Sequence, residues 1–271
     1  MCYSAEVQLA TSLFIIIFVL VCWVIYHKKY STYKTKWENS FLKYALLGSL
    51  CIGGHQFFEF LTIVTGNIII YKIGLIISIS SMYFFLRSYE VLVNTKIHSW
   101  IALIVVVLTS IHLSLIEMTV STTTFFVRHH AAFVWAFAWI LLLTYLHAVA
   151  LKEYFTTKNR KEAHFILLLL LFSLDISFIF GLTYVIFGYY LAGLSVCMDF
   201  GSIWCTFSVI QTLFIPFILT KLHSSFNREK KTSVQSFKTM GILLLISLAV
   251  LIFLLTSVPL FDCAIWKYVF P

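Results

Sequence analysis

Residues 6–26 read EVQLATSLFIIIFVLVCWVIY, and the basic residues Lys28 and Lys29 follow shortly after this run. Its length matches the ~20 apolar residues that an α-helix needs to cross a bilayer. A cleaved signal peptide has basic residues before its apolar run and a small-residue cleavage site after it, and this run has neither. We therefore expect the run to be a retained first transmembrane helix.

Further apolar runs of similar length follow the first one. They are continuous, so they lack the alternation of apolar and polar residues that a transmembrane β-barrel needs. The chain is therefore predicted to be a single all-α domain, residues 1–271, folded as a polytopic membrane helix bundle with about eight transmembrane helices. The predicted spans are residues 6–26, 41–63, 69–93, 97–120, 130–152, 163–187, 190–220 and 239–259.

The composition supports a membrane protein. Hydrophobic residues make up 61% of the chain and charged residues 11%, and the mean hydropathy is +0.97. Soluble domains are nearer half apolar and a quarter charged. The net charge of +8 does not indicate nucleic-acid binding, because the basic residues do not form one patch with interleaved aromatic residues.

The basic residues instead alternate between the predicted loops. All but three of the 19 Lys and Arg residues fall in or beside the intervals after the first, third, fifth and seventh spans. The exceptions are Lys72, Arg128 and Lys267. Because cytoplasmic loops are enriched in Lys and Arg, we expect these four intervals to be cytoplasmic and both termini to be non-cytoplasmic.

Ionisable side chains inside the spans gather toward the predicted outer side. At a rise of ~1.5 Å per residue, His55 and His112 lie roughly two-thirds of the way outward, and Asp199 reaches a similar depth. Cys51, His55 and Glu59 are four residues apart and share one helix face. Such groups are costly inside a bilayer and usually face a bundle interior or a wet cavity. We therefore expect an outward-facing site of imidazole and carboxylate groups.

One interpretation of this site is a divalent metal centre. His55, His112 and Asp199 would ligate zinc or a similar ion, because three protein ligands leave one position for an activated water. Glu59 would either hydrogen-bond a ligand of the ion or act as a general base beside it, and Glu59 and Asp199 are the candidate catalytic carboxylates. The alternative is that His55, Glu59 and Asp199 hydrogen-bond with one another as packing contacts or as a proton relay.

Three further features leave alternatives open. His98 and His112 have the spacing of ligands to stacked haems, but no second helix carries a matching pair, so we do not expect haem. Asp175, in the sixth span, is either a lone proton carrier or a helix-interface residue. Cys2 is a candidate nucleophile, metal ligand or disulfide partner on the outer side, or an inert residue.

Three short stretches carry a family resemblance. Residues 1–5 read MCYSA, residues 55–60 read HQFFEF and residues 202–205 read SIWC. These stretches resemble an uncharacterised family of bacterial multi-pass membrane proteins whose chains begin Met-Cys-Phe-Ser-Ala and contain Gln-Gln-x-x-Glu-Gly and Ser-Val-Trp-Cys elements. The resemblance implies a multi-pass architecture and a bacterial inner membrane location. Because His55 stands where the family has Gln, it favours Gln56, Glu59, Ser202 and Cys205 as site residues.

These observations predict a membrane-embedded enzyme that acts on a lipid or small amphiphile from the outer leaflet. One alternative is a transporter of a small solute or proton, for which Asp175 and the glycine- and proline-interrupted seventh span would matter. Another is a ligand-binding sensor or assembly subunit. The expected partners are the lipid bilayer and a lipid or small-molecule ligand, and the candidate substrate-binding residues are Gln56, Asp175, Ser202, Trp204 and Cys205.

Overall fold

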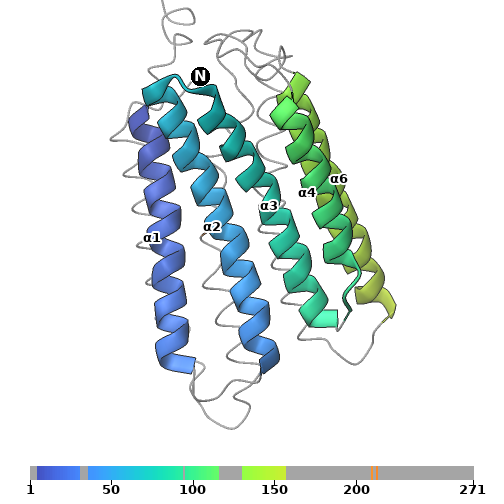
Figure 1. Cartoon of the computed structure of the whole chain (residues 1–271). Coiled ribbons are helices and arrows are strands. Elements are labelled where there is room, and N and C mark those ends of the chain that lie inside the picture. The colour runs from blue at the N-terminus through green and yellow to red at the C-terminus, as the bar shows by residue number, and fades with distance from the viewer. Residues whose placement is uncertain are drawn as a thin grey trace, which may run out of the picture.

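The computed structural model describes residues 5–30, 36–93, 95–115 and 130–156 and the single positions 209 and 212. Within these ranges the protein is all-helical, and the first five predicted spans are each an α-helix. The helices lie side by side and alternate in direction (Figure 1). The predicted spans 163–187, 190–220 and 239–259 fall outside the described ranges apart from the two single positions. The helices are α1 (Ala5–Tyr30), α2 (Lys36–Thr65), α3 (Ile68–Val93), α4 (His98–Leu115) and α6 (His130–Thr156).

Four of these helices are long and apolar enough to cross a membrane. Their apolar segments are Gln8–Ile25, Ser40–Thr65, Ile68–Val91 and His98–Leu115, with 18, 26, 24 and 18 residues. At ~1.5 Å per residue, even the shorter segments span about 27 Å, close to the thickness of a bilayer core. The length and composition of these helices thus agree with the predicted membrane environment.

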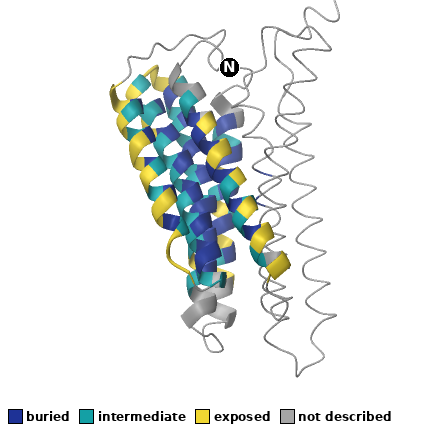
Figure 2. Ribbon diagram, turned by 90° about the vertical axis from the view of Figure 1, so that its right-hand side faces the viewer, coloured by how far each residue is buried: buried dark blue, intermediate teal, exposed yellow. Residues whose placement is uncertain are grey.

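The outer surface of the bundle is apolar. Buried residues line the inside of the helices, whereas exposed residues follow their outer faces (Figure 2). Exposed side chains of this kind, in rows along whole helices, are expected where lipid tails replace water. The exposed large apolar residues include Leu13, Ile17, Leu20, Val21 and Val24 of α1, Trp100, Ile104, Val107, Leu108 and Ile111 of α4, and Phe137, Ile140 and Leu141 of α6.

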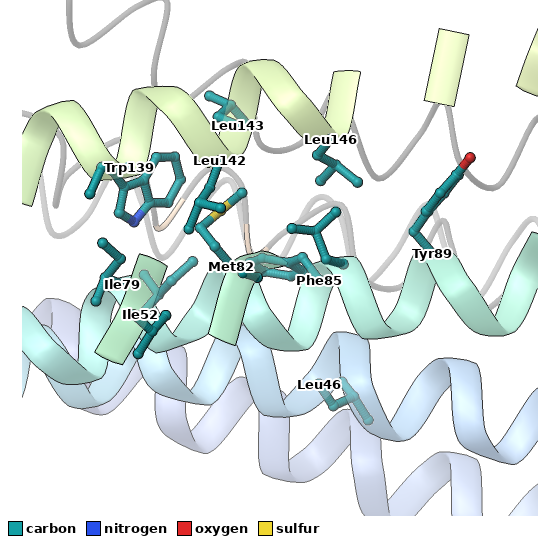
Figure 3. Close-up of a cluster of buried hydrophobic side chains, with 14 of the residues drawn as sticks. Leu46, Ile52, Ile79, Met82, Phe85, Tyr89, Trp139, Leu142, Leu143 and Leu146 are labelled. Carbon is teal, nitrogen blue, oxygen red and sulfur yellow. The ribbon is translucent and has the colours of Figure 1, made fainter. Parts of the chain in front are cut away.

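The core lies around α3, which packs against α2, α4 and α6. Figure 3 shows Trp139, Leu142 and Leu146 of α6 facing Ile79, Met82 and Phe85 of α3. On the other side of α3, Leu46 and Ile52 of α2 belong to the same buried cluster. This packing sets the register of three helices and so places the polar side chains described below.

A two-residue turn, Gly66-Asn67, joins α2 to α3. Gly66 has a φ of 65°, a left-handed conformation that residues with a Cβ rarely adopt, and its N–H donates to Thr62 O at 2.8 Å. Asn67 then caps α3, because its Oδ1 accepts from the Ile69 N–H at 2.9 Å. The sequence Thr65-Gly66-Asn67 thus ends one helix and begins the next in antiparallel direction.

Gly53 allows α1 and α2 to pack closely. A Cβ at Gly53 would lie 2.9 Å from Ile15 Cγ2 and 2.9 Å from Ile16 Cγ1. Ile15 is fully buried and β-branched, so it has little freedom to move aside. At the neighbouring Gly54, a Cβ would meet Ile77 Cγ2 at 3.4 Å, an ordinary contact.

We expect Gly53→Ala to destabilise the protein because it forces α1 away from α2, at a cost of about 1–3 kcal/mol. The thermal midpoint of the detergent-solubilised full chain would measure this loss. Gly54→Ala is the matched control, and its midpoint should stay close to that of the parent protein. Equal midpoints for the two variants would contradict the close approach at Gly53.

A buried carboxylate ties the end of α3 to the start of α4. Glu90, which is 1% exposed, accepts from Ser99 N at 2.8 Å, from Ser99 Oγ at 2.7 Å and from Arg87 Nη1 at 2.6 Å. Arg87 and Glu90 are three residues apart on α3 and form an ion pair. The same carboxylate also supplies an acceptor for a backbone N–H in the first turn of α4, where the helix itself provides none.

Removal of Glu90 should cost much more stability than removal of Arg87. Glu90→Ala leaves the buried N–H and hydroxyl of Ser99 without their acceptor, and we expect a loss of about 3 kcal/mol. Arg87→Ala leaves both bonds from Ser99 in place, and its loss should be about 1 kcal/mol. Thermal unfolding of both variants in one detergent checks the ranking, and the reverse ranking would contradict it.

Candidate functional site

Buried polar side chains of α1 and α2 gather toward one end of the bundle. We call this set the polar layer, and it consists of Gln8, Ser12, His55, Gln56 and Glu59. The exposed fractions are 2%, 0%, 1%, 0% and 7% in that order. Polar groups buried among apolar helices are costly unless they are satisfied, so we take this set as the candidate site. Its end of the bundle is the one that contains the turn between α2 and α3 (Figure 1).

The imidazole of His55 is held by the backbone of the neighbouring helix. Its Nδ1 lies 3.1 Å from Gly74 O on α3, and the ring centroid lies 5.8 Å from that of Trp135 on α6. This reach depends on the glycine, because a Cβ at Gly74 would lie 3.0 Å from the Cβ of Phe58 and 3.6 Å from His55 Nδ1. The close approach of α2 and α3 therefore sets the orientation of the ring.

The bond to Gly74 decides which ring nitrogen carries the proton in the neutral imidazole. A carbonyl oxygen only accepts, so Nδ1 must be the N–H donor and Nε2 carries the lone pair. Nε2 faces Glu59 Oε1 at 3.6 Å, four residues along α2. An imidazole lone pair and a carboxylate oxygen repel each other at close range. The arrangement therefore favours one proton or another cation between the two atoms.

The contact at Gly53 sets the register of α1 against α2. Ile15 of α1 lies opposite Gly53 of α2, and the two helices run antiparallel. One helical turn from this contact toward the α2–α3 turn, Ser12 of α1 is therefore level with Gln56 of α2. One turn further in the same direction, Gln8 is level with Glu59. Gln8, Ser12, Ile15 and Val19 form one buried stripe along α1.

The structure joins some of the predicted site residues and does not describe others. The predicted sharing of one helix face by His55 and Glu59 is confirmed, and Gln56 is buried beside them. His112 lies half-buried on α4. Among the described positions, no three His, Cys, Asp or Glu residues are grouped closely enough to hold a metal. The predicted roles of residues outside the described ranges stay predictions, and these residues are Cys2, Asp175, Asp199, Ser202, Trp204 and Cys205.

The sequence reasoning missed Gln8 and Ser12. The two residues are four apart and so share one face of the first helix, and this spacing was the available signal. It also missed the polar contacts at the opposite end of the bundle. There His98 Nδ1 bonds Tyr145 Oη at 2.8 Å, and Tyr89 Oη donates to Val149 O at 2.9 Å. These contacts join α3, α4 and α6, and no local spacing could have revealed them.

Comparison of the chain with protein-family models, curated proteins and solved structures finds no match. The resemblance to a bacterial family therefore stays a prediction. Of its three stretches, residues 55–60 are described, and they lie on α2 with Gln56 and Glu59 both buried. The assignment of a site therefore depends on the geometry of the polar layer itself.

The tautomer of His55 is directly measurable. We expect nitrogen NMR of the detergent-solubilised protein, labelled at histidine, to show a ring protonated at Nδ1. The signal of His55 is the one that disappears in His55→Gln. In Gly74→Ala the inserted Cβ disturbs the approach of α2 to α3, so the proton at Nδ1 should lose its hydrogen-bonded shift. A neutral ring protonated only at Nε2 in the parent protein would contradict this assignment.

Proposed function

We propose that the chain forms an eight-pass integral membrane protein with both termini outside and with the polar layer near the outer face. The four span-length helices and the distribution of Lys and Arg support this topology. The bundle end opposite the polar layer contains Arg87, Lys96 and Lys152, as expected for a cytoplasmic side. The family resemblance supports a bacterial inner membrane.

We infer that the polar layer is the acid–base centre of a membrane-embedded enzyme acting on a lipid or small amphiphile. The observation that carries this proposal is the buried pair in which His55 Nε2 faces Glu59 Oε1 at 3.6 Å. Glu59 would take a proton from an attacking hydroxyl or water and return it to the leaving group. His55, oriented by Gly74, would hold the carboxylate in place and share its proton.

Glu59 also lies at a suitable depth for such a substrate. It is six residues from the end of α2 at Thr65, or about 9 Å along the helix axis. The head group of an amphiphile in the outer leaflet reaches this depth without leaving the membrane. Glu59 retains 7% exposure, whereas His55 retains 1%, so Glu59 is the more accessible of the two groups.

A divalent metal such as zinc is the cofactor that the pair would hold. A ligating histidine commonly donates its other ring N–H to a backbone carbonyl, as His55 does to Gly74. Two ligand atoms on a tetrahedral zinc, each bonded at ~2.0–2.2 Å, lie roughly 3.3–3.5 Å apart, close to the separation in this pair. Asp199 is the proposed further ligand and a second catalytic carboxylate, with Cys2 as an alternative nucleophile. His112 is a ligand expected from the sequence, but within the described residues it does not form a group of three with His55 and Glu59.

Proton-coupled transport of a small solute is the second candidate function. The observation that favours it is the same pair, because two buried facing acceptors bind one exchangeable proton, as intramembrane relays do. Asp175 would be the further carrier on this proposal. Ser202, Trp204 and Cys205 would belong to the substrate-binding region in either case, and a ligand-binding sensor would use the same region without turnover.

Reconstitution of the full chain into vesicles of phosphatidylethanolamine and phosphatidylglycerol tests the enzyme directly. We expect the vesicle lipids or an added neutral amphiphile to be consumed, with products followed by mass spectrometry. Glu59→Gln should lower the rate at least about 100-fold, because it removes general acid–base catalysis. Glu153→Gln is the matched control, because it removes a carboxylate of α6 at the end of the bundle opposite the polar layer, and it should keep the parent rate.

Two further readouts distinguish the alternatives. Turnover by Glu59→Gln at the parent rate would overturn the enzyme proposal. Proton uptake into the vesicles that Glu59→Gln abolishes, without any product, would instead establish the carrier. For the metal, we expect about one zinc or similar ion per chain in the purified protein and a lower thermal midpoint after chelation. If the protein is fully active but contains no stoichiometric ion and its thermal midpoint does not change on chelation, the metal is removed from the proposal.

A further inference from the structure

Gln8 and Ser12 present buried polar atoms to the inside of the bundle without a hydrogen-bond partner. In the part of the chain that the structure describes, neither Gln8 Oε1 nor Ser12 Oγ makes a hydrogen bond. Both residues are at most 2% exposed. Several serine hydroxyls in these helices bond to a carbonyl of their own helix, as Ser49 does to Ala45 O at 3.1 Å, whereas Ser78 Oγ on α3 also lacks a partner among the described residues. An unsatisfied buried polar atom costs free energy, so two on one helix face call for an explanation.

The two atoms lie on the face of α1 that packs against α2. They continue the stripe of Ile15 and Val19, whose side chains are fully buried. Since Ile15 meets Gly53, Ser12 is level with Gln56 and Gln8 is level with Glu59. The unsatisfied atoms therefore lie on the face of α1 that packs against α2, at the levels of Gln56 and Glu59.

The chemistry of this interface is uncharged and hydrogen-bonding. Gln8 Oε1 is an acceptor, Ser12 Oγ can donate or accept, and Gln56 adds an amide at the same level. None of the buried residues in the described ranges is Lys or Arg, and Lys72, at the start of α3, is half-buried. A phosphate offers only acceptors and favours cationic partners, whereas a hydroxyl or amide group both donates and accepts. The set therefore suits an uncharged polar group.

We propose that α1 and α2 form a binding site for an uncharged, hydroxyl- or amide-bearing head group of an amphiphile, which Gln8 and Ser12 hydrogen-bond beside Glu59. This inference rests on the proposed function and names its substrate class. The flank of α1 next to Ser12 is apolar and exposed, because Leu13, about 100° of helix rotation from Ser12, is 43% exposed. The acyl chain of the ligand would thus remain in lipid along α1 while the head group enters between the helices.

Thermal shifts of the purified full chain in detergent test the site, with monooleoylglycerol as the neutral probe and dioleoyl phosphatidic acid as the charged one. We expect monooleoylglycerol to raise the midpoint of the parent protein by several degrees near saturation, and phosphatidic acid to raise it less. Gln8→Leu and Ser12→Ala should each weaken monooleoylglycerol binding about tenfold. Ser49→Ala, which removes a hydroxyl that is already satisfied, should bind like the parent.

The midpoint without ligand separates binding from a structural role. If Gln8 Oε1 and Ser12 Oγ lack partners in the free protein, Gln8→Leu and Ser12→Ala should leave this midpoint unchanged or raise it. Lower midpoints together with parent-like binding would show that the two residues serve packing or a trapped water, and would overturn the site. A larger shift with phosphatidic acid than with monooleoylglycerol would overturn the assigned head-group class.

Failure of the site and failure of the proposed enzyme are distinguishable. If Glu59→Gln loses turnover and keeps the monooleoylglycerol shift, both proposals stand. If the shift depends on Gln8 and Ser12 but the parent protein forms no product, the binding site stands and the enzyme fails. If no probe shifts the midpoint while lipid turnover depends on Glu59, the enzyme stands and the site between α1 and α2 is overturned.

Discussion

Two glycines allow α2 to lie so close to its neighbours that backbone and side chains of different helices meet. At Gly53 the methyl groups of Ile15 and Ile16 occupy the space that a Cβ would need, and at Gly74 the approach brings a backbone carbonyl to His55. In lipid, apolar burial does not drive helices together, so close packing and interhelical hydrogen bonds must do so. The orientation of the His55 ring depends on this close approach, and so does the position of its Nε2 opposite Glu59.

The two ends of the bundle use buried carboxylates in different ways. Glu90 accepts two hydrogen bonds from Ser99 and one from Arg87, so its charge is compensated within the fold and it serves to join α3 to α4. Glu59 faces an imidazole lone pair at 3.6 Å, and unsatisfied oxygens of Gln8 and Ser12 lie at nearby levels on α1. Glu90 is thus a structural carboxylate that joins two helices, whereas Glu59 lies at a level where α1 presents polar atoms to α2.

Sequence reasoning performed best where the controlling interaction is local. The first five apolar runs are helices within a few residues of their predicted ends, because the length of an apolar run largely sets the length of a membrane helix. The pairing of His55 with Glu59 follows from their spacing of four residues on one helix. The sequence did not predict that Gln8 and Ser12 belong to the polar layer, because their inward orientation depends on how α1 is rotated about its axis. The pairing of Glu90 with Arg87 involves residues three apart on one helix, but the bonds of Glu90 to Ser99 depend on the turn between two helices.

The sequence by itself thus determined that the described part is a set of long apolar helices suited to a bilayer, and which polar residues share a helix face. Both properties follow from the order of residues along one helix and from its fixed rise and rotation. The tertiary structure decided that Gly74 O meets His55 and that Ser12 lies level with Gln56. It also decided that Tyr145 bonds His98. These contacts depend on the axial register and rotation of separate helices, which the packing at Gly53, Gly74 and the core of α3 establishes only when the bundle assembles.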